Sequence, residues 1–300
     1  MGRQEYAPED SFMKISFLSL CFFLFFSGPL AAFEQEETFT DLTPGQGMLD
    51  PAALAQLLRQ GDVRAMNNIA LLWAKGYNGK QSYVEALNWW KEAARHGYTV
   101  AMNNLGLMYA NGHGGAQDYA EAFKWWHQSA FLGNAWAMNS VGDLYENGFG
   151  TQRDLMMAMT WYKSAAEQGD PLGMYNVGLL HEAGSGVDRD DADALAWFRK
   201  SAGLGYGSAM HRIGRMYADG RAVDADLVEA LAWYSVADLR YPPEDAAEAK
   251  SNRQSIEEIT ARLDAAQRAL ARDRAAAIDA VTQPAKREPP KPLLPGEKST

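Results

Sequence analysis

The sequence lacks most of the residues that common catalytic and metal sites require. It contains one cysteine, Cys21, and five histidines in 300 residues. No two histidines have the spacing of a metal-binding motif. Basic residues are also scarce, because 28 lysines and arginines stand against 38 acidic residues, for a net charge of −10. We therefore expect no catalysis, no metal, no cofactor and no nucleic-acid partner, since phosphate binding needs a basic surface.

A long hydrophobic run is missing too. The longest extends only from Ile15 to Phe26, which is too short for a comfortable membrane span. Lys14 precedes it and small residues follow up to Ala32, which is the pattern of a secretory signal peptide over residues 1–32, with Met13 as the start that we expect. Its removal would leave no cysteine and no stable membrane anchor. The expected location is the bacterial periplasm or the exterior.

What the sequence does contain is a pattern that returns every 36 residues. One dipeptide ending in Met, one glycine and one tryptophan each occur five times at this spacing. They are Ala65-Met66, Ala101-Met102, Ala137-Met138, Gly173-Met174 and Ala209-Met210; Gly76, Gly112, Gly148, Gly184 and Gly220; and Trp89, Trp125, Trp161, Trp197 and Trp233. Five copies without drift in phase predict one supersecondary unit stacked five times over residues 65–241.

Each unit is expected to be a pair of helices. In the second unit, Leu105 and Met108 belong to a helical pattern that ends at Gly112, a residue suited to a left-handed C-terminal cap. A polar loop follows, and a second helical run carries Trp125 and Trp126. An oxygen-bearing residue precedes each second helix and predicts an N-cap at Ser82, Asp118, Asp154, Asp190 and Asp226.

Small residues indicate how the two helices of a unit pack. Gly106 in the first helix and Ala122 in the second recur as small residues in the other units. We predict that they let the two backbones approach, while large neighbours fill the surrounding volume. By the same reasoning Trp161 is predicted to be a central core residue of the third unit.

The run from Ala101 to Gly112, followed by Ala-x-x-Trp-Trp and Ala-x-x-Gly, resembles the Sel1-like repeat, a relative of the tetratricopeptide repeat. The resemblance covers about residues 65–241. It implies an all-α fold, a right-handed α-solenoid of helix-turn-helix repeats with capping helices at its ends. It also implies a function, that of a periplasmic adaptor or regulatory scaffold that binds a protein or peptide of the cell envelope without catalysis.

The segments outside the repeats are expected to cap or extend the stack. An apolar stripe from Ile256 to Leu270, opened by the capping pair Ser255 and Glu258, predicts either a short coiled-coil seam or, as we favour, packing on the fifth unit. The expected segments are an acidic linker at 33–48, an N-terminal capping helix at 49–64, C-terminal capping helices at 242–281 and a proline-rich disordered tail at 282–300.

Candidate partner-binding residues follow from the resemblance, which implies that the first helices line the concave side of the solenoid. The outward positions form two ladders, and Trp136 joins them because no packing position explains it. The ladders are Asn67, Asn103, Asn139, Tyr175 and His211, and Leu71, Leu107, Asp143, Leu179 and Arg215. Asparagine can donate to and accept from a partner's backbone, but the same side chains can instead bond neighbouring repeats. Both interpretations stay open.

An alternative function is a periplasmic cell-wall or polysaccharide-binding module, or an enzyme of Sel1-like type. The nine tryptophans could stack on sugars. Eight of them fall in or beside the predicted core positions, however, which weakens that alternative. We expect the protein to be a monomer.

Overall fold

The computed structural model describes residues 57–76, 80–241 and 245–282, and every regular element in these ranges is an α-helix. The predicted signal peptide, the acidic linker and the proline-rich tail beyond Thr282 lie outside the described residues. Of the expected N-terminal capping helix, only its end is described, where residues 57–59 are helical. No described helix is both long enough and apolar enough to cross a membrane.

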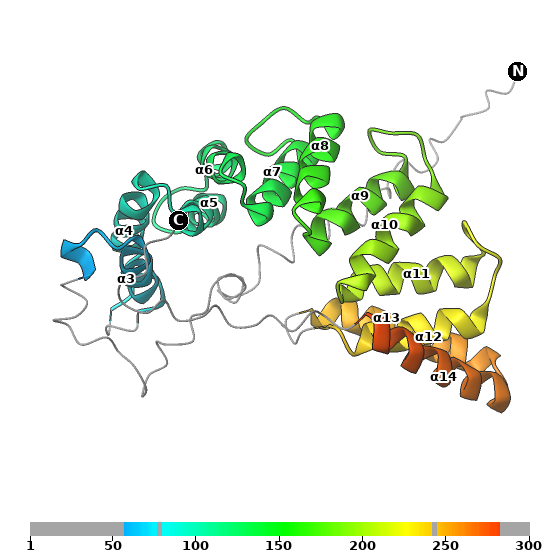
Figure 1. Ribbon diagram of the computed structural model, residues 1–300. Helices are drawn as coiled ribbons and strands as arrows, with labels where there is room; N and C mark the ends of the chain where they lie inside the picture. The colour runs from blue at the N-terminus through cyan, green and yellow to red at the C-terminus, as the bar shows by residue number, and fades with distance from the viewer. Residues whose placement is uncertain (1–56, 77–79, 242–244, 283–300) are drawn as a thin grey trace, which may run out of the picture. The chain divides into compact units, whose positions relative to one another are not determined.

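The helices follow one another as pairs joined by loops (Figure 1). The five pairs are α3 (Val63–Lys75) with α4 (Tyr83–Arg95), α5 (Thr99–Asn111) with α6 (Tyr119–Phe131), α7 (Ala135–Asn147) with α8 (Leu155–Glu167), α9 (Pro171–Ala183) with α10 (Asp191–Gly203), and α11 (Gly207–Asp219) with α12 (Leu227–Asp238). Two longer helices, α13 (Ala246–Arg262) and α14 (Ala265–Val281), follow them. Each second helix also contacts the first helix of the next pair. The all-helical repeat array is confirmed.

Local sequence signals set the helix boundaries as predicted. The Ser82 hydroxyl accepts a hydrogen bond from the backbone of Glu85, and each of the four aspartates in the equivalent positions accepts two backbone N–H groups. The first helices end at glycines with φ between 66° and 72°, a left-handed conformation that carries no Cβ penalty there. The loop inside every unit therefore has a glycine C-cap before it and an oxygen-bearing N-cap after it.

The small residues of the first helices have a different role from the one expected. A Cβ at Gly106 would lie 2.1 Å from Trp126 Nε1, and one at Gly178 would lie 2.6 Å from Phe198 Cε1. The glycine thus leaves room for an aromatic ring of the second helix, more than for the other backbone. The buried rings are Trp90, Trp126, Tyr162, Phe198 and Tyr234.

Trp161 lies one position before this buried aromatic series. The prediction that Trp161 is the central core residue of the third unit is wrong, since Tyr162 is 1% exposed and Trp161 is only partly buried. Helical geometry turns adjacent residues by about 100°, so only one of two neighbouring aromatics can face the first helix.

The C-terminal helices α13 and α14 pack against α12. Val228 and Leu231 of α12 share one buried cluster with Ile259, Leu263 and Ala271. This contact buries a face of α12 that the end of the repeat array would otherwise expose.

The apolar stripe of this region is divided between two helices. Asp264 caps α14 in a reciprocal capping box with Gln267, and α13 has already ended at Arg262. The predicted capping pair Ser255 and Glu258 is therefore wrong. Because α13 begins at Ala246, Ser255 lies inside the helix, and its hydroxyl donates to a carbonyl one turn earlier.

Candidate functional site

The first of the two predicted ladders joins neighbouring units. Every position in it makes a polar contact with the following unit or with α13. The contacts are Asn67 Oδ1 with Asn104 Nδ2 (3.0 Å), Asn103 Nδ2 with Asn134 Oδ1 (3.1 Å), Asn139 Nδ2 with Asp170 Oδ2 (2.5 Å), Tyr175 Oη with Arg212 Nε (3.4 Å) and His211 Nδ1 with Asn252 Oδ1 (3.0 Å). Of the two interpretations left open, the structure favours bonding between repeats.

Burial at the asparagine positions supports this assignment. Asn67, Asn103 and Asn139 are 6%, 7% and 2% exposed. The expectation that they project toward a partner is therefore wrong, because their amide groups are enclosed between units. The Oδ1 atoms of Asn103 and Asn139 have no hydrogen-bond partner in the described part of the chain, but both atoms are buried.

The second ladder is not a continuous exposed surface either. Leu71 and Leu107 are buried, which contradicts their expected exposure, and Leu179 packs against the core of the fourth and fifth units. Arg215 is exposed and pairs with Asp219 on its own helix, with a nitrogen–oxygen distance of 3.5 Å. A role in partner binding stays a prediction for Leu179 and Arg215.

Trp136, the remaining candidate outside the ladders, is partly buried. Its ring meets the Trp126 ring edge-on at a centroid distance of 5.7 Å. A packing position therefore does explain Trp136, contrary to the expectation. The contact links the end of the second unit's core to the first turn of α7.

Asp143, the third residue of the second ladder, belongs to a partly buried group that we call the carboxyl cluster: Asp143, Glu146 and Tyr162. The Tyr162 hydroxyl oxygen lies 2.5 Å from Asp143 Oδ1 and 2.9 Å from Glu146 Oε2. A phenol carries a single proton and can donate it to only one of these oxygens at a time. The other carboxyl group completes the second short contact when it is protonated and donates to the phenol oxygen.

Burial explains why the carboxyl cluster holds a proton. Removal from water raises the pKa of Asp143 to about 7, and it raises the pKa of Glu146 in the same direction. The hydroxyl of Tyr162 lowers both values, but by less than burial raises them. Because the Tyr162 ring fills the core beside these groups, the cluster is suited to packing and not to holding a substrate.

Sequence reasoning missed a surface that we call the aromatic patch: Phe123, His127, Phe131, Leu132 and Trp161. The His127 ring lies 5.2 Å from Phe123, 4.6 Å from Phe131 and 5.5 Å from Trp161, measured between centroids. Phe131 is 71% exposed and Leu132 is 55% exposed. The patch therefore joins the end of α6 to the middle of α8 and presents apolar surface to solvent.

Comparison between repeats would have revealed the aromatic patch. The residues equivalent to Phe131 in the first and third units are Arg95 and Glu167. The fourth and fifth units have Gly203 and Leu239 there, so Phe131 is the one aromatic residue at this position of the five units. The patch is also uncharged at neutral pH, because burial lowers the pKa of His127 below its usual value.

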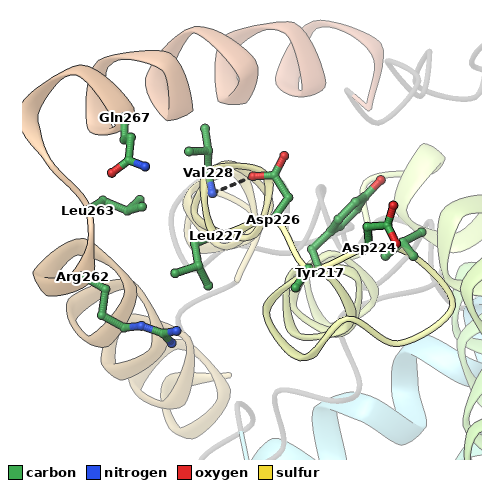
Figure 2. Close-up of a pocket in the computed structure, with 10 residues that line it drawn as sticks. Tyr217, Asp224, Asp226, Leu227, Val228, Arg262, Leu263 and Gln267 are labelled. Atoms are coloured by element: carbon green, nitrogen blue, oxygen red, sulfur yellow. Dashed lines mark hydrogen bonds between the residues drawn. The ribbon is translucent and has the colours of Figure 1, made fainter.

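A cavity of about 540 Å³ lies beside the start of α12 (Figure 2). Tyr217 and Asp224 line one side, and Arg262 and Gln267, at the corner between α13 and α14, line the other. Asp226 also borders it, but its carboxylate caps α12 and pairs with an arginine of α14. The polar groups here are thus partly committed to holding the C-terminal helices. No group of three or more potential metal ligands is assembled within the described ranges.

Comparison with known proteins gives a family. The sequence profile of the Sel1 repeat matches residues 63–98, 99–134, 137–170, 171–206 and 207–237. These matches coincide with the five helix pairs. No curated protein sequence is similar to the chain.

Solved structures show the same architecture. The chain is similar to c5321, a protective antigen of uropathogenic Escherichia coli strains, with 25% identity over 78% of this chain and a TM-score of 0.68. It spans only 49% of that antigen. A Sel1 repeat protein from Oxalobacter formigenes is 31% identical over 64% of this chain and 80% of its own length, with a TM-score of 0.60.

Proposed function

Because the chain belongs to the Sel1 repeat family, we propose that it is a non-catalytic scaffold of the bacterial cell envelope that binds a protein or peptide partner. The repeat array provides a long surface whose interior is devoted to packing between units. The buried asparagines of the first ladder and the carboxyl cluster are used in that packing. Partner binding would then use exposed side chains that do not contribute to packing between units.

The aromatic patch is the observation that carries this proposal. Phe131 and Leu132 are large, apolar and mostly exposed, and the Phe131 ring meets the partly buried ring of Trp161 edge-on at 5.8 Å. Contiguous apolar side chains on the surface of a soluble protein are more often interaction sites than packing accidents. We therefore place the partner surface on the second helices of the second and third units, in place of the first-helix ladders.

The proposal is tested by replacing the patch with the residues of the third unit. The double variant Phe131→Glu and Leu132→Gln carries the side chains of the equivalent positions Glu167 and Gln168. Both original side chains are exposed, so the melting temperature should stay within a few degrees. Affinity capture from an envelope extract, with identification by mass spectrometry, should show one protein retained by the wild type and lost from the variant.

A matched control uses the position of the fifth unit equivalent to Phe131. Leu239 is 67% exposed, and Leu239→Gln should retain the same protein as the wild type. The proposal fails if the wild type retains no protein that purified components can reconstitute. It also fails if the patch variant and the wild type retain the same proteins equally.

Export belongs to the same proposal. Residues 1–32 carry the signal-peptide pattern, which supports a mature chain that begins near Phe33 in the periplasm or outside the cell. N-terminal sequencing of the protein recovered from its native host tests this. An intact Met1 or Met13 in the membrane fraction would overturn it.

Binding of a cell-wall polymer is the second candidate function. One observation favours it, because Trp161 is not the core residue that its position in the repeat predicted, and its ring lies in the aromatic patch. Co-sedimentation with purified peptidoglycan tests the candidate. Sedimentation that Trp161→Ala abolishes and Trp197→Ala does not would support it over a protein partner.

A further inference from the structure

The aromatic patch differs from the other junctions between units in one systematic way. The second helix of the first, third and fourth units carries a basic residue at one position, occupied by Lys91, Lys163 and Arg199. The equivalent residue of the second unit is His127. Lys91, Lys163 and Arg199 therefore serve as three references for the role of this position in other units.

In two of these references the basic residue meets an aromatic ring of the next unit. Lys91 Nζ lies 5.7 Å from the centroid of the Tyr109 ring. Arg199 donates a hydrogen bond of 3.0 Å to the Tyr217 hydroxyl. The Lys91 contact is a cation–π contact, in which the negative charge of the ring face attracts the ammonium group, whereas Arg199 contacts the phenol oxygen of its partner. These junctions thus supply their own cation.

The junction between the second and third units supplies aromatic surface without that cation. The ring equivalent to Tyr109 and Tyr217 is Tyr145, and it is met edge-on by Phe123 at 5.4 Å. Burial lowers the pKa of His127, so its imidazole is neutral at pH 7. Both cation–ring contacts found in the described residues, those of Lys91 and Lys200, lie in other units.

The surroundings of the patch favour a basic occupant. The chain carries a net charge of −10, which attracts cationic segments of a partner. Phe131 is mostly exposed and its ring lies 4.6 Å from the neutral His127 ring, so an incoming side chain would contact an aromatic ring and an uncharged imidazole. Arginine suits such a surface best, because its planar guanidinium stacks on aromatic rings and is weakly hydrated.

We propose that the aromatic patch receives an arginine or lysine side chain, flanked by apolar residues, from a protein partner. The incoming cation supplies the positive charge that Lys91 and Arg199 supply in their own units. This inference rests on the proposed function, since it names the chemistry of the partner at the same surface. It predicts that restoring an internal lysine at His127 closes the site.

The experiment is a peptide-display selection on the full chain with a random twelve-residue library. Selection on the wild type should enrich arginine or lysine next to Leu, Ile, Val or aromatic residues. Counter-selection on His127→Lys should remove those peptides. Replacement of the basic residue by citrulline or norleucine in one enriched peptide should weaken binding about tenfold, as measured by calorimetry.

Two variants distinguish the loss of the binding site from the loss of the folded structure. His127→Lys introduces the residue that the first and third units already hold, so it should melt within a few degrees of the wild type and bind the enriched peptide at least tenfold more weakly. Leu239→Gln should bind that peptide as the wild type does. Equal binding to the wild type and to His127→Lys would overturn the inference.

The outcomes also distinguish this inference from the proposed function. Enriched peptides that lack basic residues, yet lose binding in Phe131→Glu, would overturn the cation and leave the scaffold proposal standing. Failure to enrich any peptide overturns the inference. If capture from the envelope extract also fails, the proposed function falls with it. Patch-dependent binding of peptidoglycan, with no peptide enriched, would replace both with the glycan candidate.

Discussion

The third and fourth units carry a glutamate at the same position, Glu146 and Glu182, but surround it with different partners. Glu146 of the third unit shares the Tyr162 hydroxyl with Asp143, and burial raises its pKa. Glu182 of the fourth unit forms ion pairs with Arg212, at 3.2 Å, and with Arg221, at 2.7 Å. Burial thus drives Glu146 toward its neutral form, while Glu182 lies between two arginine side chains.

The following unit decides this difference. Arg212 and Arg221 lie in the fifth unit, and the equivalent residues of the fourth unit, which follow Glu146, are Asn176 and Ser185. Glu146 therefore meets no pair of arginines from its neighbour, and the charge of Arg153 in its own unit lowers its pKa by less than burial raises it. A buried carboxylate needs either a counter-charge or a proton, and each unit uses the one that its surroundings provide. The stack thus tolerates quite different chemistry at equivalent junctions.

The largest effect should come from the buried aromatic ring of the second helix, which is Tyr162 in the third unit and Phe198 in the fourth. Tyr162→Ala should cost about 3–5 kcal/mol of unfolding free energy, because it empties a fully buried site and removes the hydroxyl between two carboxyl groups. Trp161→Ala, on the half-buried neighbour, should cost roughly 1–2 kcal/mol. Urea unfolding of both variants measures the difference. Equal losses would return Trp161 to the core.

The pH dependence of stability should have opposite signs in the two units. The folded pKa of Asp143, about 7, lies above its ordinary value of 3.8, so the native state binds the extra proton and stability falls as the pH rises from about 4 to 7. At about 1.4 kcal/mol per pKa unit, the loss by pH 8 is roughly 2–4 kcal/mol. Asp143→Asn should flatten this decline in urea unfolding at pH 5 and pH 8.

Asp191 provides the matched case in the fourth unit. Hydrogen bonds from Arg221, and secondarily from Arg189, lower its pKa to about 2. The stability that the ionised Asp191 carboxylate contributes is complete above about pH 4 and is lost as the pH falls toward 2. Asp191→Asn should therefore alter the profile only below pH 4. A decline between pH 5 and 8 that persists in Asp143→Asn would contradict the assignment of the proton to the carboxyl cluster.

The glycine that receives each ring offers a smaller contrast. A Cβ at Gly142 would lie 2.5 Å from Tyr162 Cε1, and one at Gly178 would lie 2.6 Å from Phe198 Cε1. Alanine should cost about 1–3 kcal/mol at either site. The loss should be larger at Gly142, because two hydrogen bonds restrain the Tyr162 hydroxyl, whereas the buried Phe198 ring is held by packing alone.

A control for this contrast lies at the end of α10. A Cβ at Gly203 would have no atom within 4 Å, so Gly203→Ala should stabilise the chain by about 0.5–1 kcal/mol through helix propensity. Thermal melting of the three alanine variants checks the order. A loss at Gly178 that exceeds the loss at Gly142 would show that the hydroxyl does not restrain the Tyr162 ring.

The smallest effect concerns the loop after the first helix. Gly186 of the fourth unit has φ of 74°, and the equivalent residue of the fifth unit is Ala222, with φ of 62°. An alanine in the left-handed region carries strain, so Ala222→Gly should stabilise the chain by about 1 kcal/mol. Gly186→Ala should destabilise it, since its Cβ would also lie 2.7 Å from Leu155 Cβ. Melting temperatures that move the other way would refute the strain.

The local elements could be predicted because their determinants are local. Asp118 and Gly112 show this: an oxygen acceptor before a helix and a glycine after one act through backbone geometry within a few residues. Because the pattern returns every 36 residues, a helix boundary predicted correctly in one unit is also predicted in the other four. The Ser255 pair failed because the same local signal also occurs inside a longer helix, where packing on α12 had already set the start at Ala246.

The candidate site could not be predicted in the same way. Whether Asn103 points to a partner or to Asn134 depends on how far one unit is rotated against the next, and both residues look equally polar in the sequence. The aromatic patch left a signal, because Phe131 is an aromatic residue at a position where the first and third units carry charge. That signal requires knowing that the position is exposed.

The period, the helix pairs and their caps could be read from the sequence, since they depend on interactions between residues close together in the chain. The packing of helices was needed to show that Tyr162 is buried in preference to Trp161, which asparagines bridge units and which carboxyl groups have raised pKa values. Those outcomes depend on burial and on contacts between helices. Such contacts join residues 16 to 39 positions apart, while a cap depends on the next three.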